Sequence, residues 1–341
     1  FVNSFINGTN WADEVTAIDR LAKLTKEDIV TFVNKYLTDQ NYAVIYKKQG
    51  QNPNEKKMAK PTITPIVMNR DVASDFLKEI QNSNVKPIEP VFLDFKKDLS
   101  QLKAKSGIPV LYKQNTSNDL FQLIYVFDMG NNNDKALGTA FDYIDYLGTS
   151  DMTPEQVKSE FYRLACNFRV SPGNERTYVV LSGLNENMPE AMKLFEKLMA
   201  DAQVNKEAYT NMVADILKSR KDAKLNQMQN FRRLMNYGMY GPKSPATNIL
   251  TETELQTMDP QELTDRIHNQ NSYKHRIMYY GPTSEKELLA IINKNHQAPK
   301  KLKEIPVGNE FPRLETPVTK VLISPYEAKQ IYMTQLSNRG E

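Results

Sequence analysis

The spacing of apolar residues divides this chain into short helices and strands joined by polar connections. A helix opened by the cap Thr25-Lys26-Glu27-Asp28 carries Ile29 and Val33 on one face. The run Tyr42–Tyr46 that follows predicts a β-strand. Residues 1–50 are therefore expected to form the end of a helix-and-strand domain.

Residues 93–298 show a longer alternation that predicts a complete domain. In chain order, the predicted elements are a hairpin of Ile108–Tyr112 with Leu120–Phe127, a helix over 134–148, a helix opened by Thr153–Gln156, a hairpin of Asn167–Val170 with Thr177–Leu184, two helices carrying Met188–Met199 and Tyr209–Ile216, a helix capped by Asp259–Glu262, a strand His275–Tyr280 and a helix opened by Ser284–Glu287. We interpret the methionines of the two central helices as core filling. Because hairpins are mixed with helices, the pattern predicts an α+β fold, a largely antiparallel sheet with helices packed on one face.

Residues 51–92 are predicted to be an inter-domain linker. Five prolines lie in this stretch, and this residue disfavours continuous helix or central strand. A short helix is expected within it, around Ser74–Gln81.

Residues 299–341 are predicted to be a basic, proline-containing connector and the start of a following domain. Two strand-like runs support this view, Val318–Ile323 and Gln330–Leu336. The chain begins at Phe1 without an initiator methionine, so we expect an excised segment of a longer protein.

Composition and charge narrow the classes of function. With 40% hydrophobic and 25% charged residues and a net charge of +3, the chain has the composition of a globular domain and no strong field for a polyanion. The densest basic run, Lys218–Arg233, is interrupted by acidic and polar residues and is interpreted as a solvated helix face, which disfavours nucleic-acid binding.

No uncharged run approaches the roughly 18 residues that span a bilayer. Cys166, the only cysteine, lies in an apolar setting and is expected to be a buried, inert thiol.

The helix at 139–149 has the outline of a metallopeptidase active-site helix without its ligands. In the inverted zinc motif His-x-x-Glu-His, the two histidines and the glutamate would occupy Thr139, Asp142 and Tyr143. None of the three is a histidine. We place these residues on a polar face, opposite an apolar face that includes Ala140 and Leu147.

The remaining titratable residues give no self-sufficient catalytic, cofactor-binding or metal site. His268, His275 and His296 do not share the spacing that places two imidazoles on one helix face, so we expect solvated or capping histidines. Asp142 and Asp145 are expected to be solvated surface carboxylates.

The order of these elements resembles one α/β repeat of the pitrilysin/insulinase-type zinc metallopeptidases. The resembling segments, in order, are the hairpin Ile108–Phe127, the helix ending Tyr146-Leu147-Gly148-Thr149, the helix opened by Thr153–Gln156, the hairpin Asn167–Leu184, a helix pair and Tyr237–Gly241. Residues 24–48 are similar to the end of a preceding repeat, and residues 317–341 to the beginning of a following one. Each motif is weak alone, and their order carries the resemblance.

The resemblance implies a protein of four repeats in two halves that close around a peptide-sized chamber. This chain would supply the tail of the second repeat (1–50), a linker (51–92), a complete non-catalytic third repeat (93–298), and a connector with the start of the fourth (299–341). Zinc would be bound elsewhere in the full-length protein, and a further glutamate of the family has Asp215 as its nearest acidic counterpart here, to which we assign no role.

Two functional classes follow from the resemblance. The first is a non-catalytic segment of a zinc metalloendopeptidase, which supplies scaffold and chamber wall while the N-terminal catalytic half binds the metal. Its partners would be a peptide or unfolded polypeptide substrate and that catalytic half, and its compartment, left open by the sequence, would be the bacterial periplasm. The alternative is a wholly inactive structural or peptide-binding subunit of the same fold.

Overall fold

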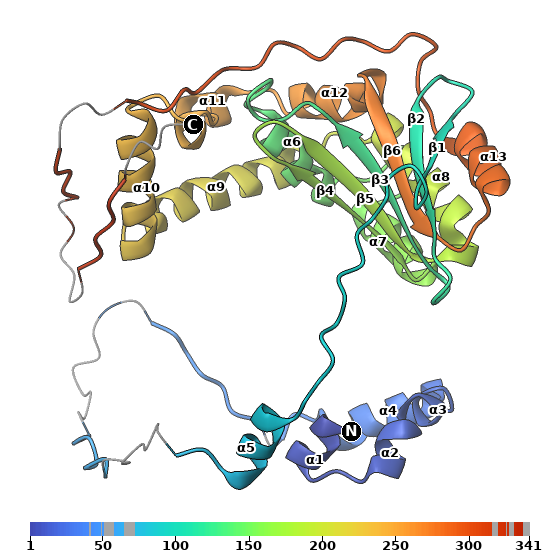
Figure 1. Cartoon of the computed structure of the whole chain (residues 1–341). Coiled ribbons are helices and arrows are strands. Elements are labelled where there is room, and N and C mark those ends of the chain that lie inside the picture. The colour runs from blue at the N-terminus through green and yellow to red at the C-terminus, as the bar shows by residue number, and fades with distance from the viewer. Residues whose placement is uncertain are drawn as a thin grey trace. The chain divides into compact units, whose positions relative to one another are not determined.

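The computed structural model divides the chain into two units, Phe1–Pro87 and Ile88–Glu341 (Figure 1). It describes residues 1–40, 42–48, 50, 58–64, 72–315, 320–324, 326 and 331–336. All of the β-sheet that the structure describes lies in the second unit.

The first unit contains short helices in its described part. They are α1 (Val2–Asn7), α2 (Trp11–Val15), α3 (Ala17–Leu21), α4 (Lys26–Tyr36) and α5 (Asp75–Asn82). The capping signals are confirmed, because Thr25 and Asp28 form a reciprocal capping box at α4 and the Ser74 side chain caps α5. The strand predicted at Tyr42–Tyr46 is wrong, since these residues form no strand and belong to no described sheet.

The second unit is built on one open six-stranded sheet. In chain order its strands are β1 (Ser100–Lys103), β2 (Pro109–Gln114), β3 (Leu120–Phe127), β4 (Cys166–Pro172), β5 (Thr177–Leu184) and β6 (His275–Gly281). Their spatial order is β1-β2-β6-β3-β5-β4, and within this sheet only β2 and β6 run parallel. The expected α+β class with a largely antiparallel sheet is confirmed.

The first predicted hairpin is wrong, whereas the second is confirmed. β6 lies between β2 and β3, so that Ile277 faces Val110 on one side and Tyr125 on the other. A strand from the far end of the domain therefore supplies the hydrogen bonds that a hairpin would have made locally. β4 and β5 pair directly across a short turn.

Helices cover one face of this sheet (Figure 1). They are α6 (Leu137–Tyr143), α7 (Pro154–Arg163), α8 (Met188–Asp201), α12 (Gln261–Asn269) and α13 (Glu285–Asn295), with α9 (Lys206–Ala223), α10 (Gln227–Tyr240) and α11 (Glu252–Thr257) beside them. Alternate residues of β6, such as Ile277 and Tyr279, are buried beneath the helices. Met278 and Tyr280 point to the other face, where Met278 is half-buried and Tyr280 is exposed.

The core lies between the sheet and the helix layer. Phe195 of α8 is fully buried and its ring contacts those of Tyr125 and Phe168. Met188, Met192 and the other predicted methionines of this helix are buried as well, which confirms their assignment to the core.

The helix predicted over 134–148 is shorter than expected. α6 ends at Tyr143, the backbone tightens into a 3₁₀ turn over Ile144–Tyr146, and Leu147 is already extended. Gly148 then passes close to Met152 and Thr153, which precede α7. On its other side, its carbonyl oxygen accepts from the backbone N–H of Gln203, just after α8, at 2.9 Å.

Gly148→Ala is expected to lower the free energy of unfolding by about 1–3 kcal/mol, which urea unfolding would measure. A Cβ atom at this position would lie 2.2 Å from the Met152 carbonyl oxygen and 2.9 Å from the Thr153 carbonyl carbon, so the backbone has to move. Gly238→Ala is the control, because its Cβ in helix α10 would meet only leucine side-chain ends. An unchanged midpoint for Gly148→Ala would contradict this close approach.

Candidate functional site

The residues at the zinc-motif positions have three different environments. Thr139 is half-buried, Asp142 is exposed, and Tyr143 is fully buried. The expectation of a shared polar face is therefore wrong for Tyr143. Its position follows from helical spacing, because Tyr143 lies three residues after the buried Ala140, on the apolar side of α6.

Tyr143 fixes the beginning of α9. Its hydroxyl donates to the Asn205 carbonyl oxygen at 2.6 Å and accepts from the Asn205 backbone N–H at 2.8 Å. Asn205 is the N-cap of α9, where its side chain accepts from the Ala208 N–H, and the Tyr143 ring meets Tyr209 edge-on. At a position that the resemblance assigns to a zinc-binding histidine, this chain therefore has a core tyrosine that ties α6 to α9.

An open groove of about 520 Å³ lies between α6, α9 and α10. Asp142 and Asp145 face it from the α6 side, and Asp215, the predicted counterpart of the family glutamate, faces it from α9. Met212, Ile216, Tyr146 and the basic residues Arg220 and Arg233 complete most of its wall. The structure thus brings Asp142 and Asp215 to one groove, whereas Thr139 and Tyr143, at the two histidine positions of the motif, do not line it.

The electrostatics of the groove are those of a mixed-charge surface. Asp142 is exposed by area, yet the groove walls desolvate its carboxyl enough to raise its pKa, and repulsion from Asp145 acts in the same direction. Arg220 donates to the Leu250 carbonyl oxygen at 2.7 Å, which ties this side chain to the loop before α11. The expectation of solvated aspartates is confirmed for Asp145, while Asp142 is partly desolvated.

These side chains do not fit a zinc ion. Structural and catalytic zinc sites use three or four His, Cys or carboxylate ligands that converge on one point. Over the described part of the chain, no three such side chains converge closely enough to hold a metal ion. Tyr143, at the second histidine position, is turned away toward Asn205.

The histidines and the cysteine lie apart from this groove. His268 is half-buried with its Nε2 3.1 Å from the Ala202 carbonyl oxygen, so its expected capping role is confirmed. For His275 and His296 the expectation of solvated or capping rings is wrong, because both side chains are buried and their Nε2 atoms are 2.8 Å apart. Cys166 is buried as predicted, and burial raises the pKa of its thiol, which makes it a poor nucleophile at neutral pH.

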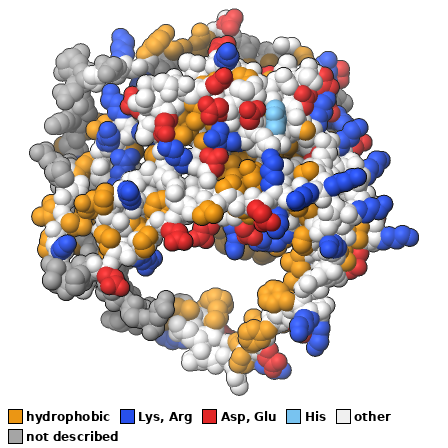
Figure 2. Space-filling model, turned by 90° about the horizontal axis from the view of Figure 1, so that it is seen from above, with side chains coloured by type: hydrophobic (Ala, Val, Ile, Leu, Met, Phe, Trp, Pro, Cys, Tyr) orange, Lys and Arg blue, Asp and Glu red, His pale blue; other side chains and the backbone are white. Residues whose placement is uncertain are grey.

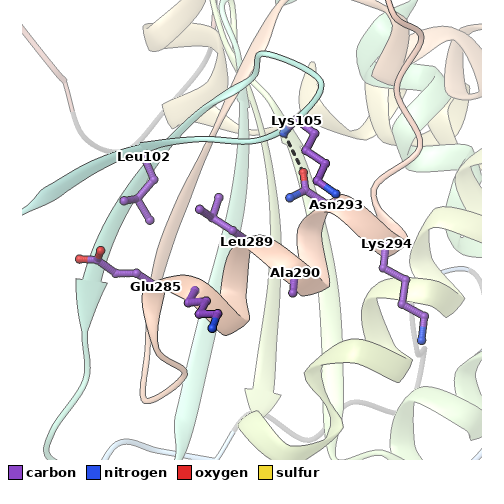
Figure 3. Close-up of a pocket in the computed structure, with 8 residues that line it drawn as sticks. Leu102, Lys105, Glu285, Leu289, Ala290, Asn293 and Lys294 are labelled. Carbon is purple, nitrogen blue, oxygen red and sulfur yellow. Dashed lines mark hydrogen bonds between the residues drawn. The ribbon is translucent and has the colours of Figure 1, made fainter.

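A second, larger groove lies at the edge of the sheet, between β1 and α13 (Figure 3). Leu102 and Leu289 line its floor, and the backbone N–H of Lys105 donates to Asn293 Oδ1 at 2.8 Å. Three lysines and Glu285 are its charged residues. It contains no nucleophile–base pair and no metal-ligand set, so the groove at α6 remains the candidate site.

The surface offers no large field of one charge on the face seen in Figure 2, where acidic and basic side chains are interspersed. Among the helices that the structure describes, none is long and apolar enough to cross a bilayer. The basic residues of Lys218–Arg233 are mostly exposed on α9 and α10, as expected for a solvated helix face.

The same mixed α/β fold occurs in solved peptidase structures of very different sequence. The periplasmic protease PqqL from Escherichia coli matches with a TM-score of 0.56 at 13% identity, over 87% of this chain and 31% of that chain. A peptidase M16 inactive domain from Pseudomonas fluorescens matches with 0.52 at 16% identity, over 63% of this chain and 54% of that one. A mutant of the ferredoxin protease FusC, in complex with Arabidopsis ferredoxin, matches with 0.54 at 11% identity, over 86% and 30%.

The likeness is confined to structure. No protein-family model matches the sequence, and no curated protein matches it either. This chain spans between 30% and 54% of the length of those three structures. With these identities and TM-scores, the likeness shows a shared fold alone.

Proposed function

We propose that this chain is a non-catalytic segment of a pitrilysin/insulinase-type zinc metalloendopeptidase. It supplies scaffold and chamber wall, while zinc and the general base belong to the N-terminal catalytic half of the same protein. The observation that carries the proposal is Tyr143. The helix arrangement of a peptidase domain is present, but a ligand position is occupied by a buried tyrosine bonded to Asn205.

The open face of the sheet supports a role in contacting polypeptide. Ile124, Val180 and Met278 lie half-buried on the face away from the helices, and Tyr178 and Tyr280 beside them are exposed. Exposed apolar and aromatic side chains of this kind are typical of surfaces that bind another polypeptide. PqqL is described as periplasmic, and we propose the bacterial periplasm as the compartment of this protein too.

The purified chain is expected to hold no stoichiometric zinc and to cleave no peptide. The reason is the ligand set, since no histidine or cysteine lines the groove at α6 and its charged side chains are three aspartates and two arginines. Elemental analysis after dialysis against zinc, together with a quenched fluorescent peptide library, tests both points. The positive control for the peptide assay is a zinc endopeptidase in the same buffer.

The outcomes separate the two functional classes. One tightly held zinc per chain, or cleavage abolished by a chelator, would overturn the proposal. Peptide cleavage that appears only when the N-terminal half is added supports the enzyme. Peptide binding without cleavage in the complete protein supports the wholly inactive subunit instead.

A further inference from the structure

Glu196 of α8 is a buried carboxylate whose acceptor sites are all used. Its side chain is 1% exposed. Oε1 accepts from the Tyr125 hydroxyl at 3.0 Å and lies 2.6 Å from His296 Nδ1. Oε2 accepts from Asn271 Nδ2 at 2.9 Å and from the Gln297 backbone N–H at 3.1 Å. Four donors match the roughly four lone-pair sites of an ionised carboxylate, so Glu196 is the acceptor in every contact.

The hydrogen-bond network assigns the protons of both histidines. His275 Nδ1 is 2.7 Å from the Tyr273 carbonyl oxygen, which only accepts, so this nitrogen carries a proton. Burial is the main cause that lowers the pKa of His275 to about 4; the hydrogen bond to Tyr273 opposes it, and repulsion from His296 acts in the same direction as burial. The ring is therefore neutral, and its Nε2 is an acceptor. His296 Nε2, at 2.8 Å, must then donate to it. His296 donates from both nitrogens and is an imidazolium beside Glu196.

This chain of contacts fastens residues 296–309, here called the strap, to the domain. Beyond Gln297, the strap is held by backbone hydrogen bonds of Lys303 with Ser272 and Lys274, at 2.7 and 3.0 Å, and by packing of Leu302 and Ile305 against the core. Its far end is bonded from the Asn309 N–H to the Asn132 carbonyl oxygen at 2.7 Å. Of the ion pairs that the described strap makes, the one between His296 and Glu196 is buried, whereas the one between Glu304 and Lys274 is exposed.

We propose that Glu196, His296 and His275 form an acid-sensitive latch that holds the strap on the domain and releases it when His275 gains a proton. His275 Nε2 supplies the lone pair that receives His296 Nε2–H. A proton on that nitrogen removes the acceptor and sets two cations 2.8 Å apart. His296 can no longer keep both of its hydrogen bonds, and the strap loses its buried anchor.

The groups that face the latch leave His275 as its acid sensor. Tyr125 comes from β3, and burial together with Glu196 raises the pKa of its hydroxyl well above the usual value, so it remains a neutral donor. Asn271, between α12 and β6, contributes an uncharged amide. Among the described residues, no lysine or arginine side chain hydrogen-bonds to Glu196 or His296.

Hydrogen exchange at several pH values, expressed as protection factors, tests the latch. For His275 alone, a pKa of 6.5 when released and about 4 when latched makes opening roughly 50-fold more favourable at about pH 4.5 than at about pH 7. The proton that the latch holds on His296 is partly lost on release at about pH 7, which opposes this effect and leaves a net factor of roughly 10- to 20-fold. The backbone amides of Gln297 and Lys303 should therefore lose protection by about that factor, while amides of the central strand β3 keep theirs. Loss of protection in strap and β3 at the same pH would overturn the proposal.

Two variants separate His275 from general acid effects. His275→Gln retains a carbonyl acceptor toward His296 but cannot gain a proton, so strap protection should become nearly independent of pH. His268→Gln is the matched control and should keep the acid response of the unmodified protein. A wild-type acid response in His275→Gln would refute the mechanism.

Imidazole ¹⁵N spectra of the unmodified protein test the proton assignment without any substitution. The expected pattern is a neutral His275 with its proton on Nδ1 and a His296 protonated on both nitrogens at neutral pH. A His275 protonated on Nε2, or a His296 with one bare nitrogen, contradicts the latch even where His275→Gln fails to fold.

Discussion

Glu196→Met is expected to lower the free energy of unfolding by about 3–5 kcal/mol, the loss typical of removing one partner from a buried ion pair. The substitution preserves approximate volume but leaves the His296 imidazolium without its counter-ion. It also leaves the Tyr125 hydroxyl and the Asn271 amide without their acceptor in the interior. Each orphaned donor adds its own desolvation penalty.

Urea unfolding followed by circular dichroism at neutral pH measures this effect. Glu190→Met on the same helix is the matched control, because that side chain is 68% exposed and should change stability by no more than about 0.5 kcal/mol. Adding His296→Phe to Glu196→Met removes the stranded cation, so the double variant should lose less than the sum of the singles, by about 1–3 kcal/mol. Strict additivity would show that the two side chains are not an ion pair.

Local chemistry made the helix boundaries readable in the sequence. Thr25 and Thr153 each form the reciprocal capping box that their sequences predict, and Ser284 caps α13 as expected. The β4–β5 hairpin was equally accessible, because its two strands are joined by a short turn. In each case the partners lie within a few residues of one another.

Contacts between distant segments could not be read in the same way. Nothing in the alternation of residues 108–127 indicates that β6 inserts between β2 and β3, since the pattern fixes faces and not neighbours. His275 and His296 looked polar and solvated for the same reason. Their partner Glu196 is on another helix, and a charged residue in an otherwise apolar helical stripe was the available signal.

The candidate site was half predictable. The family resemblance singled out Asp142 as a motif position and Asp215 as the nearest acidic counterpart of a further glutamate, and both face the groove at α6. It did not show that Tyr143 points into the core. That orientation depends on where α6 ends and on the presence of Asn205 at the start of α9, both of which are tertiary features.

Installing the zinc motif is expected to destabilise this domain without creating a metal site. The triple variant Thr139→His, Asp142→Glu, Tyr143→His should lower the free energy of unfolding by about 3–5 kcal/mol, mostly through position 143. A histidine there loses ring packing against Tyr209 and cannot reproduce both hydrogen bonds to Asn205. The backbone N–H and carbonyl at the start of α9 are then left unpaired in the interior.

Tyr143→Phe isolates the part of this effect that belongs to the hydroxyl, and it should be destabilising by about 1–3 kcal/mol. Elemental analysis, and thermal unfolding with and without zinc, test whether the triple variant binds the metal. A zinc site that formed would raise the midpoint as metal is added, because a ligand that binds only the folded state stabilises it. Such a rise, with one zinc per chain, would show that the side chain at 143 can turn from Asn205 into the groove. Its absence would mean that the buried tyrosine is part of the architecture of this domain, so that ligand substitution alone does not create a metal site.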